Sequence, residues 1–194
     1  MYPQAAAPSY SQLHGKYYTQ ARAGQMFVAS QTPAQANIFA AYPNVQFFYG
    51  IWNPLGSGVN AIVVNLRCGI ASTSPGVLNA VWVFYNTGSQ SNAAPFVSIP
   101  FGFSAPQNML IGQMGGSRVL YSPSTINLTF GATPNAVTGI SFVNSSSANY
   151  TTVLGEDYDG NFVIGPGTLA VLAASANSPT VMVSTKWYEA PVIG

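Results

Sequence analysis

The sequence contains very few charged residues. Only 5% of its 194 residues are Asp, Glu, Lys or Arg, whereas soluble domains average roughly 25%. The formal net charge is +1 and the basic residues are scattered, which argues against nucleic acid or an acidic membrane as a partner. A surface so poor in charge repels its neighbours weakly, so we expect much of it to be covered in an oligomer or lattice.

Residues that build reactive or metal sites are also scarce. The chain holds one cysteine, Cys68, and one histidine, His14. This excludes an internal disulfide framework and leaves almost nothing for a zinc site or a Cys-His nucleophile. The N-terminus lacks a basic segment followed by an apolar run, so we expect no signal peptide. No apolar run is long enough to span a bilayer.

Hydrophobic residues, by contrast, make up 48% of the chain and aromatic residues 13%. Long amphipathic patterns are missing, and about ten short apolar or alternating runs are separated by Pro- and Gly-rich turns. This pattern predicts an all-β sandwich or barrel in one domain, over residues 25–194. Five aromatic residues are the expected core or interface anchors: Phe47, Phe48, Trp52, Trp82 and Trp187.

The stretch 51–70 is expected to organise the core. Residues 53–58, N-P-L-G-S-G, predict a rigid corner because proline fixes one backbone dihedral and glycines supply unusual ones. Residues 59–70 then predict a long strand. Strict alternation would place Ile62, Val64, Leu66, Cys68 and Ile70 on one apolar face. Burial on this face makes Cys68 a small hydrophobe rather than a reactive thiol.

Residues 1–24 are rich in Ala, Gln, Tyr and Pro and show neither a helical nor a strand period. We therefore expect an extended N-terminal arm. Two alternatives stay open: an arm that lies on a neighbouring subunit, or a disordered tail. The residues expected to make arm contacts are Tyr10, Tyr17, Tyr18 and Arg22.

Three of the four acidic residues fall in the segment 155–160, G-E-D-Y-D-G. The segment predicts a hairpin turn between short strands at 150–154 and 162–164. Asp157, Asp159 and Asn161 have the alternate spacing of oxygen ligands in calcium loops, but the downstream bidentate Glu is missing, so a charged turn is the favoured interpretation. No second acid lies across a cleft, and we expect no catalytic residue and no cofactor.

Two segments together resemble a loose family of small structural proteins of tailed bacteriophages. They are I-W-N-P-L-G-S-G-V-N-A-I-V-V-N-L at 51–66, and G-P-G-T-L-A-V-L-A-A with T-V-M-V-S-T-K-W-Y-E-A-P-V within 165–192. In that family an L-W-N-P-x-G-S-G-K-N corner precedes a core strand, and P-G-T-A-L-A-L and W-E-E-x-P segments close the chain. Val59 and Tyr188 depart from this pattern. The resemblance covers roughly a quarter of the chain and consists of structural corners.

The resemblance implies a jelly-roll-like antiparallel β-sandwich that associates as a homotrimer. It implies a non-enzymatic virion protein, made in the host cytoplasm, that decorates the capsid surface and cements the head by bridging major capsid proteins. The alternative is a tail or head-fibre module that binds host-surface glycans through exposed aromatic residues and the 155–161 loop. A hydrolase is the least favoured reading.

Overall fold

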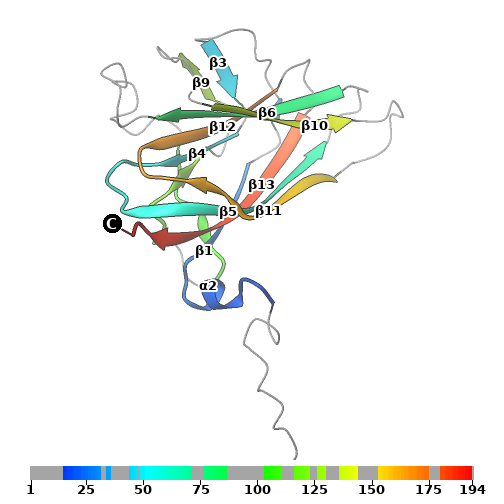
Figure 1. Cartoon of the computed structure of the whole chain (residues 1–194). Coiled ribbons are helices and arrows are strands. Elements are labelled where there is room, and N and C mark those ends of the chain that lie inside the picture. Colours follow the sequence, from blue (N-terminus) through cyan, green and yellow to red (C-terminus); the bar gives the residue numbers. More distant parts are fainter. Residues whose placement is uncertain are drawn as a thin grey trace, which may run out of the picture.

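The computed structural model describes eleven stretches of the chain: 15–31, 34–35, 44–47, 49–70, 77–86, 103–110, 116–122, 126–129, 136–143, 153–174 and 180–193. Within them the chain is mostly β-strand, in two antiparallel sheets packed face to face (Figure 1). The prediction of an all-β sandwich is confirmed. No helix of the described stretches is long and apolar enough to cross a membrane.

Two main sheets and one small sheet contain the strands. Sheet A has the order β11 (Val153–Ile164), β5 (Val59–Ile70), β13 (Thr180–Pro191), β1 (Met26–Ser30) and β7 (Gln107–Asn108), and β2 (Ala34–Gln35) also pairs with β13. Sheet B has the order β10 (Ala136–Val143), β6 (Val77–Asn86), β12 (Thr168–Ala174), β4 (Tyr49–Asn53) and β8 (Leu120–Tyr121). The small sheet pairs β3 (Asn44–Phe47) with β9 (Ile126–Thr129). The one helix among the described residues is α2 (Tyr18–Arg22).

The eight principal strands follow the order of a jelly roll. The chain changes sheet at each step from β1 to β4, β5 and β6, and again from β10 to β11, β12 and β13. The resulting four-stranded sets are β1-β13-β5-β11 and β4-β12-β6-β10, the two facing sheets of such a fold. Consecutive strands β12 and β13 therefore lie in opposite sheets. Strands β3 and β4, close in the sequence, lie in different sheets.

The core lies between the two sheets and is rich in large side chains. Trp82, Trp187, Tyr49 and Leu66 are fully buried there. A short hydrogen bond of 2.6 Å, donated by the Thr185 hydroxyl to the Tyr49 hydroxyl, crosses the core and satisfies both groups. The largest aromatic residues of the sequence thus hold the sheets together.

Strands β4 and β12 of sheet B are buried on both faces over residues 49–53 and 169–172. Trp52 alternates with the core residue Ile51 on β4, and its ring lies edge-on against Phe103 with centroids 6.2 Å apart. Figure 1 shows β3 and β9 on the side of sheet B away from sheet A. Phe47 lies in β3, and its side chain, like the whole of Phe48, falls outside the described part of the molecule.

Strand β5 does not alternate strictly, contrary to the prediction. Its pairing with β13 shifts register because Val63 and Asn65 face consecutive residues of β13, which leaves Val64 as an extra residue. This bulge reverses the side-chain phase, since one added residue moves every later side chain to the other face. Ala61 and Val63 therefore point into the core before the bulge, and Leu66 and Cys68 after it. Burial raises the pKa of the Cys68 thiol to about 12, which suits packing and not reactivity.

The segment 18–22 is helical, so the expectation of an extended arm is wrong there. The Ala23 N–H donates to the Thr19 carbonyl at 3.0 Å, and Gly24 ends the helix with a φ of +68°. Ala, Gln and Arg favour a helix, but five residues are too few to leave a helical period in the sequence. Residues 1–14 lie outside the described stretches.

Candidate functional site

The acidic segment of β11 is a bulge and not the predicted hairpin. Strand β11 pairs with β5 on both sides of it: Asp157 faces Asn65, and Phe162 faces Val63. Residues 158–161, here called the β11 bulge, therefore stand opposite the single residue Val64. Asp159 and Gly160 in the bulge have positive φ values, of +51° and +90°. Asp and Gly tolerate a positive φ better than other residues.

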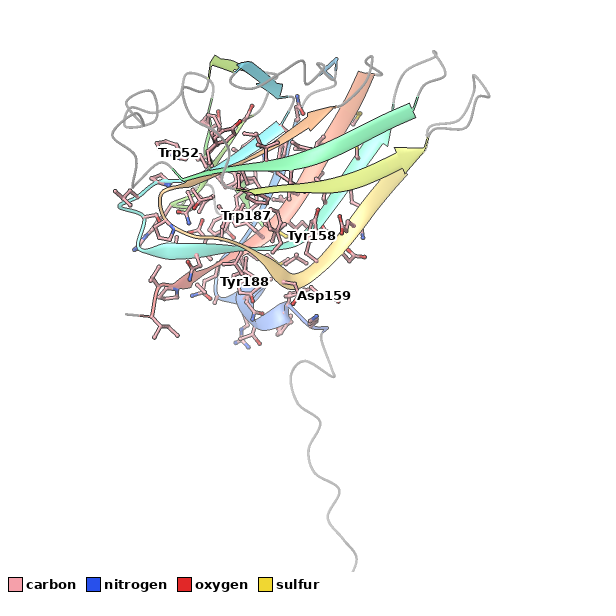
Figure 2. All side chains as sticks on the ribbon, turned by 45° about the horizontal axis from the view of Figure 1, so that its top comes forward. Trp52, Tyr158, Asp159, Trp187 and Tyr188 are labelled. Atoms are coloured by element: carbon pink, nitrogen blue, oxygen red, sulfur yellow. The ribbon has the colours of Figure 1, made fainter. Side chains whose placement is uncertain are left out.

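Tyr158, the aromatic residue of the β11 bulge, points inward. Its hydroxyl accepts a hydrogen bond of 2.8 Å from Trp82 Nε1, and its ring centroid is 5.0 Å from that of Phe162. Burial raises the pKa of this residue, Tyr158, well above its usual range. In Figure 2, Tyr158 lies toward the interior of the sandwich, whereas Asp159 lies toward helix α2. Tyr158 is therefore a half-buried residue that packs against the core.

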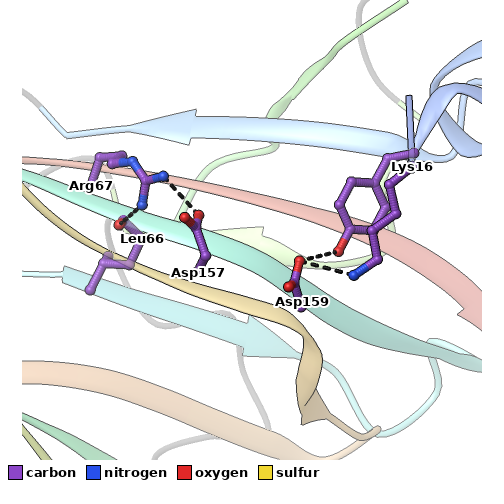
Figure 3. Close-up of polar contacts among 6 residues, drawn as sticks. Lys16, Leu66, Arg67, Asp157 and Asp159 are labelled. Carbon is purple, nitrogen blue, oxygen red and sulfur yellow. Dashed lines mark hydrogen bonds and ion pairs between the residues drawn. The ribbon is translucent and has the colours of Figure 1, made fainter. Parts of the chain in front are cut away.

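The two aspartates of the calcium-like pattern contact cations. Asp157 accepts a hydrogen bond of 2.7 Å from Arg67, and Asp159 lies 3.0 Å from Lys16 Nζ (Figure 3). Asn161 is exposed on the same segment. Across the described stretches, no group of three or more His, Cys, Asp or Glu side chains could hold a metal ion. The pattern thus forms ion pairs within the chain.

Asp159 joins the N-terminal segment to sheet A. It accepts hydrogen bonds from Lys16 and from the Tyr17 hydroxyl, the latter at 3.2 Å. The Tyr17 ring also lies 6.0 Å, between centroids, from that of Tyr188 on β13. The hydrogen bond from Lys16 lowers the pKa of Asp159, and the same bond raises the pKa of Lys16. We call Lys16, Tyr17, Asp159 and Tyr188 the latch.

The expected arm contacts are placed only in part. Tyr17 contacts the sandwich of its own chain, and its neighbour Lys16 was not anticipated because a lone lysine carries no signal of its partner. Tyr18 is half-buried, Arg22 is exposed on α2, and Tyr10 falls outside the described residues.

The predicted corner is held by a buried amide. Asn53 is fully buried, and its Nδ2 donates hydrogen bonds of 2.8 Å to the carbonyls of Val59 and Ile164. The backbone carbonyl of Asn53 accepts a hydrogen bond of 2.8 Å from the Gly167 N–H. Asn53 therefore ties the end of β4 to the start of β5 and the end of β11, where the chain crosses between the sheets.

A pocket of about 230 Å³ opens beside this corner. Its lining includes Phe27, Val59, Arg118, Glu189 and Pro191, and we call it the Glu189 pocket. Glu189 is only 7% exposed and accepts hydrogen bonds from the Ser117 hydroxyl at 2.5 Å and the Arg118 N–H at 3.2 Å. Glu189 is not among the site residues predicted from the sequence, although continuing the alternation of Thr185 and Trp187 along β13 places it inward.

The chain matches no family model, no curated protein and no solved structure. The class that the fold defines is an all-β sandwich of jelly-roll type with two polar sites on sheet A. One is the exposed latch and the other is the buried carboxylate of the Glu189 pocket.

Proposed function

We propose that this chain is a non-enzymatic structural protein of a bacteriophage virion. It would assemble as a homotrimer on the capsid surface and cement the head by bridging major capsid proteins. The resemblance of segments 51–66 and 165–192 to such proteins supports the proposal, and so does the jelly-roll order of the strands. The role would involve no chemical step. Binding of neighbouring subunits would stabilise the assembled shell by mass action.

The observation that carries the proposal is apolar exposure on a surface with few charges. Large hydrophobic side chains that are at least 45% exposed occur at five described positions: Leu55, Val163, Met182, Val192 and Ile193. Two of them define the proposed contact face: Val163 on β11 and Met182 on β13, strands of sheet A that both pair with β5. Leu55, between β4 and β5, lies outside these strands. With only five basic and four acidic residues in the chain, little charge opposes contact between copies.

Met182 also lines a groove of about 200 Å³ together with Gln31 and Arg67. Gln31 is buried, and neither atom of its amide has a hydrogen-bond partner. A buried amide without partners is costly, so a contact that supplied them would be favourable. The groove therefore supports sheet A as the contact face.

The test is the oligomeric state of the purified full chain by sedimentation velocity at micromolar concentration. We expect a trimer that Met182→Glu dissociates, because the new charge would be buried in the contact. Leu55→Glu, which adds the same charge on the corner, is the matched control and should leave the trimer intact. A stable monomer for the unaltered chain would contradict assembly. A cryo-EM map of particles with this chain away from the shell would contradict the cement role alone.

The fibre alternative requires aromatic residues that face a glycan from the 155–161 segment. Tyr158 is the aromatic residue of that segment, and its hydroxyl is bound to Trp82. We therefore favour the structural role. Glycan-array binding that is lost on Tyr158→Phe would reverse this preference.

A further inference from the structure

We propose that the Glu189 pocket binds a small zwitterion of the amino-acid type. Its ammonium group would lie against the Glu189 carboxylate and its carboxylate against the Arg118 guanidinium. This inference is independent of the virion role, because it concerns one chain and its own pocket.

The first argument is the unpaired charge of Glu189. The acids Asp157 and Asp159 each have a basic partner, but Glu189 forms no ion pair with any described residue. It is nevertheless the most buried of the three, and its carboxylate accepts from one hydroxyl and one backbone N–H. A carboxylate offers about four acceptor sites, and a buried charge is unfavourable unless it is compensated. A cationic group in the pocket would supply both remaining hydrogen bonds and charge.

The second argument is the position of Arg118. Arg118 lines the same pocket, and its Nη1 donates a hydrogen bond of 2.9 Å to the Ser57 carbonyl. A guanidinium carries five N–H donors in a planar fork that matches a carboxylate. Since Arg118 and Glu189 are not paired with each other, the wall presents one charge of each sign.

The third argument is the size and lining of the pocket. At about 230 Å³ it is smaller than the roughly 300–1,000 Å³ of sites for larger ligands. Phe27, Val59 and Pro191 supply apolar wall in the same pocket as the charged groups. A compact ligand with an aliphatic side chain and two opposite charges complements these features, whereas a neutral ligand leaves both charges uncompensated.

The experiment titrates the full chain with L-leucine by calorimetry and compares two analogues. N-acetyl-L-leucine lacks the ammonium group and L-leucinamide lacks the carboxylate. We expect each analogue to bind about tenfold or more weakly than L-leucine, as the loss of a charge-assisted hydrogen bond implies.

Three variants test which pocket residue binds the ammonium group of the ligand and which binds its carboxylate. Glu189→Gln keeps an acceptor for Ser117 and should remove the preference for L-leucine over its N-acetyl analogue. Arg118→Met should remove the preference over L-leucinamide. Arg22→Met, at an exposed arginine outside the pocket, is the control and should change neither preference.

Absence of L-leucine binding at millimolar concentration, or preferences that survive both pocket variants, would overturn the proposal. Binding of D-glucose in place of L-leucine would also overturn it and would indicate a polyol site. Arg118 is exposed, so the Arg118→Met variant should fold. Its result decides the outcome even if the Glu189→Gln variant fails to fold. The titration does not require assembly. Absence of ligand binding would therefore leave the proposed virion role unaffected, and a monomeric chain in sedimentation would leave the titration unaffected.

Discussion

The corner at Asn53 connects two strands and the bulge of β11 interrupts one, and polar groups hold the two in opposite ways. At the corner, one fully buried amide binds two carbonyls that water does not reach. At the β11 bulge, the paired side chains of Lys16 and Asp159 are 59% and 61% exposed. The corner thus joins the strands of the core, whereas the bulge attaches a surface segment.

The difference concerns what each contact contributes to the free energy of folding. Breaking a buried hydrogen bond leaves its partner unsatisfied and costs about 1–3 kcal/mol. Exposed ion pairs contribute little because water and salt screen them. We therefore infer that the corner determines global stability and that the latch determines only where residues 15–24 lie.

The strongest test of this contrast is Asn53→Ala. It removes the donor to the carbonyls of Val59 and Ile164, and we expect it to lower the free energy of unfolding by about 2–5 kcal/mol. Urea denaturation followed by tryptophan fluorescence measures the loss. Asn161→Ala, at the exposed asparagine of the bulge, is the control and should change stability by less than about 0.5 kcal/mol. Equal losses would remove the distinction between the two regions.

The corner itself could be predicted from the sequence, but the role of Asn53 could not. A proline and two glycines between apolar runs are a local signal for a turn. The partners of Asn53, however, lie 6 and 111 residues away. Only the pairing of strands brings them together, and a single sequence does not specify that pairing.

The second test is Gly160→Ala in the bulge. Gly160 has a φ of +90°, and an added Cβ would meet Ile62 at 3.5 Å and Tyr188 at 3.8 Å, which are ordinary contacts. The cost should therefore come from backbone conformation alone, about 1–2 kcal/mol. Gly56→Ala at the corner is the matched control, since no heavy atom lies within 4 Å of its added Cβ and its φ is not positive. We expect that control to be neutral by thermal or urea unfolding, and a loss as large as that of Gly160→Ala would contradict the assignment of strain to the bulge.

The β11 bulge shows why the prediction of a hairpin at the acidic segment is wrong. The dipeptide Asp159-Gly160 favours positive φ in a hairpin and in a bulge alike. What decides between them is β5, which continues past the segment and pairs with β11 on both sides of it. The ion pairs follow from the same long-range pairing, so the sequence could indicate a charged segment but not its partners, Lys16 and Arg67.

The smallest effect is expected for Asp159→Asn, which removes the charge of the latch. The midpoint of global unfolding should stay within experimental error, because both partners are exposed. The helix should nevertheless loosen, and hydrogen exchange at the Ala23 amide, which donates within α2, measures this directly. Asp157→Asn, which breaks the pair with Arg67, is the control and should leave that amide unchanged. Unaltered exchange in Asp159→Asn would contradict the latch.

The pH dependence of the latch sharpens the same test. The pKa of Asp159 is lowered in the folded chain, chiefly by its hydrogen bond from Lys16, so the latch is complete above the usual aspartate pKa of about 4 and is lost as pH falls through the lowered value. The pKa of Lys16 is raised, so its contribution is complete below about 10 and is lost as pH rises through the raised value. Between these limits the protection of the Ala23 amide, corrected for intrinsic exchange, should be constant. Its decrease in acid should be missing in Asp159→Asn, because an amide has no proton to gain there.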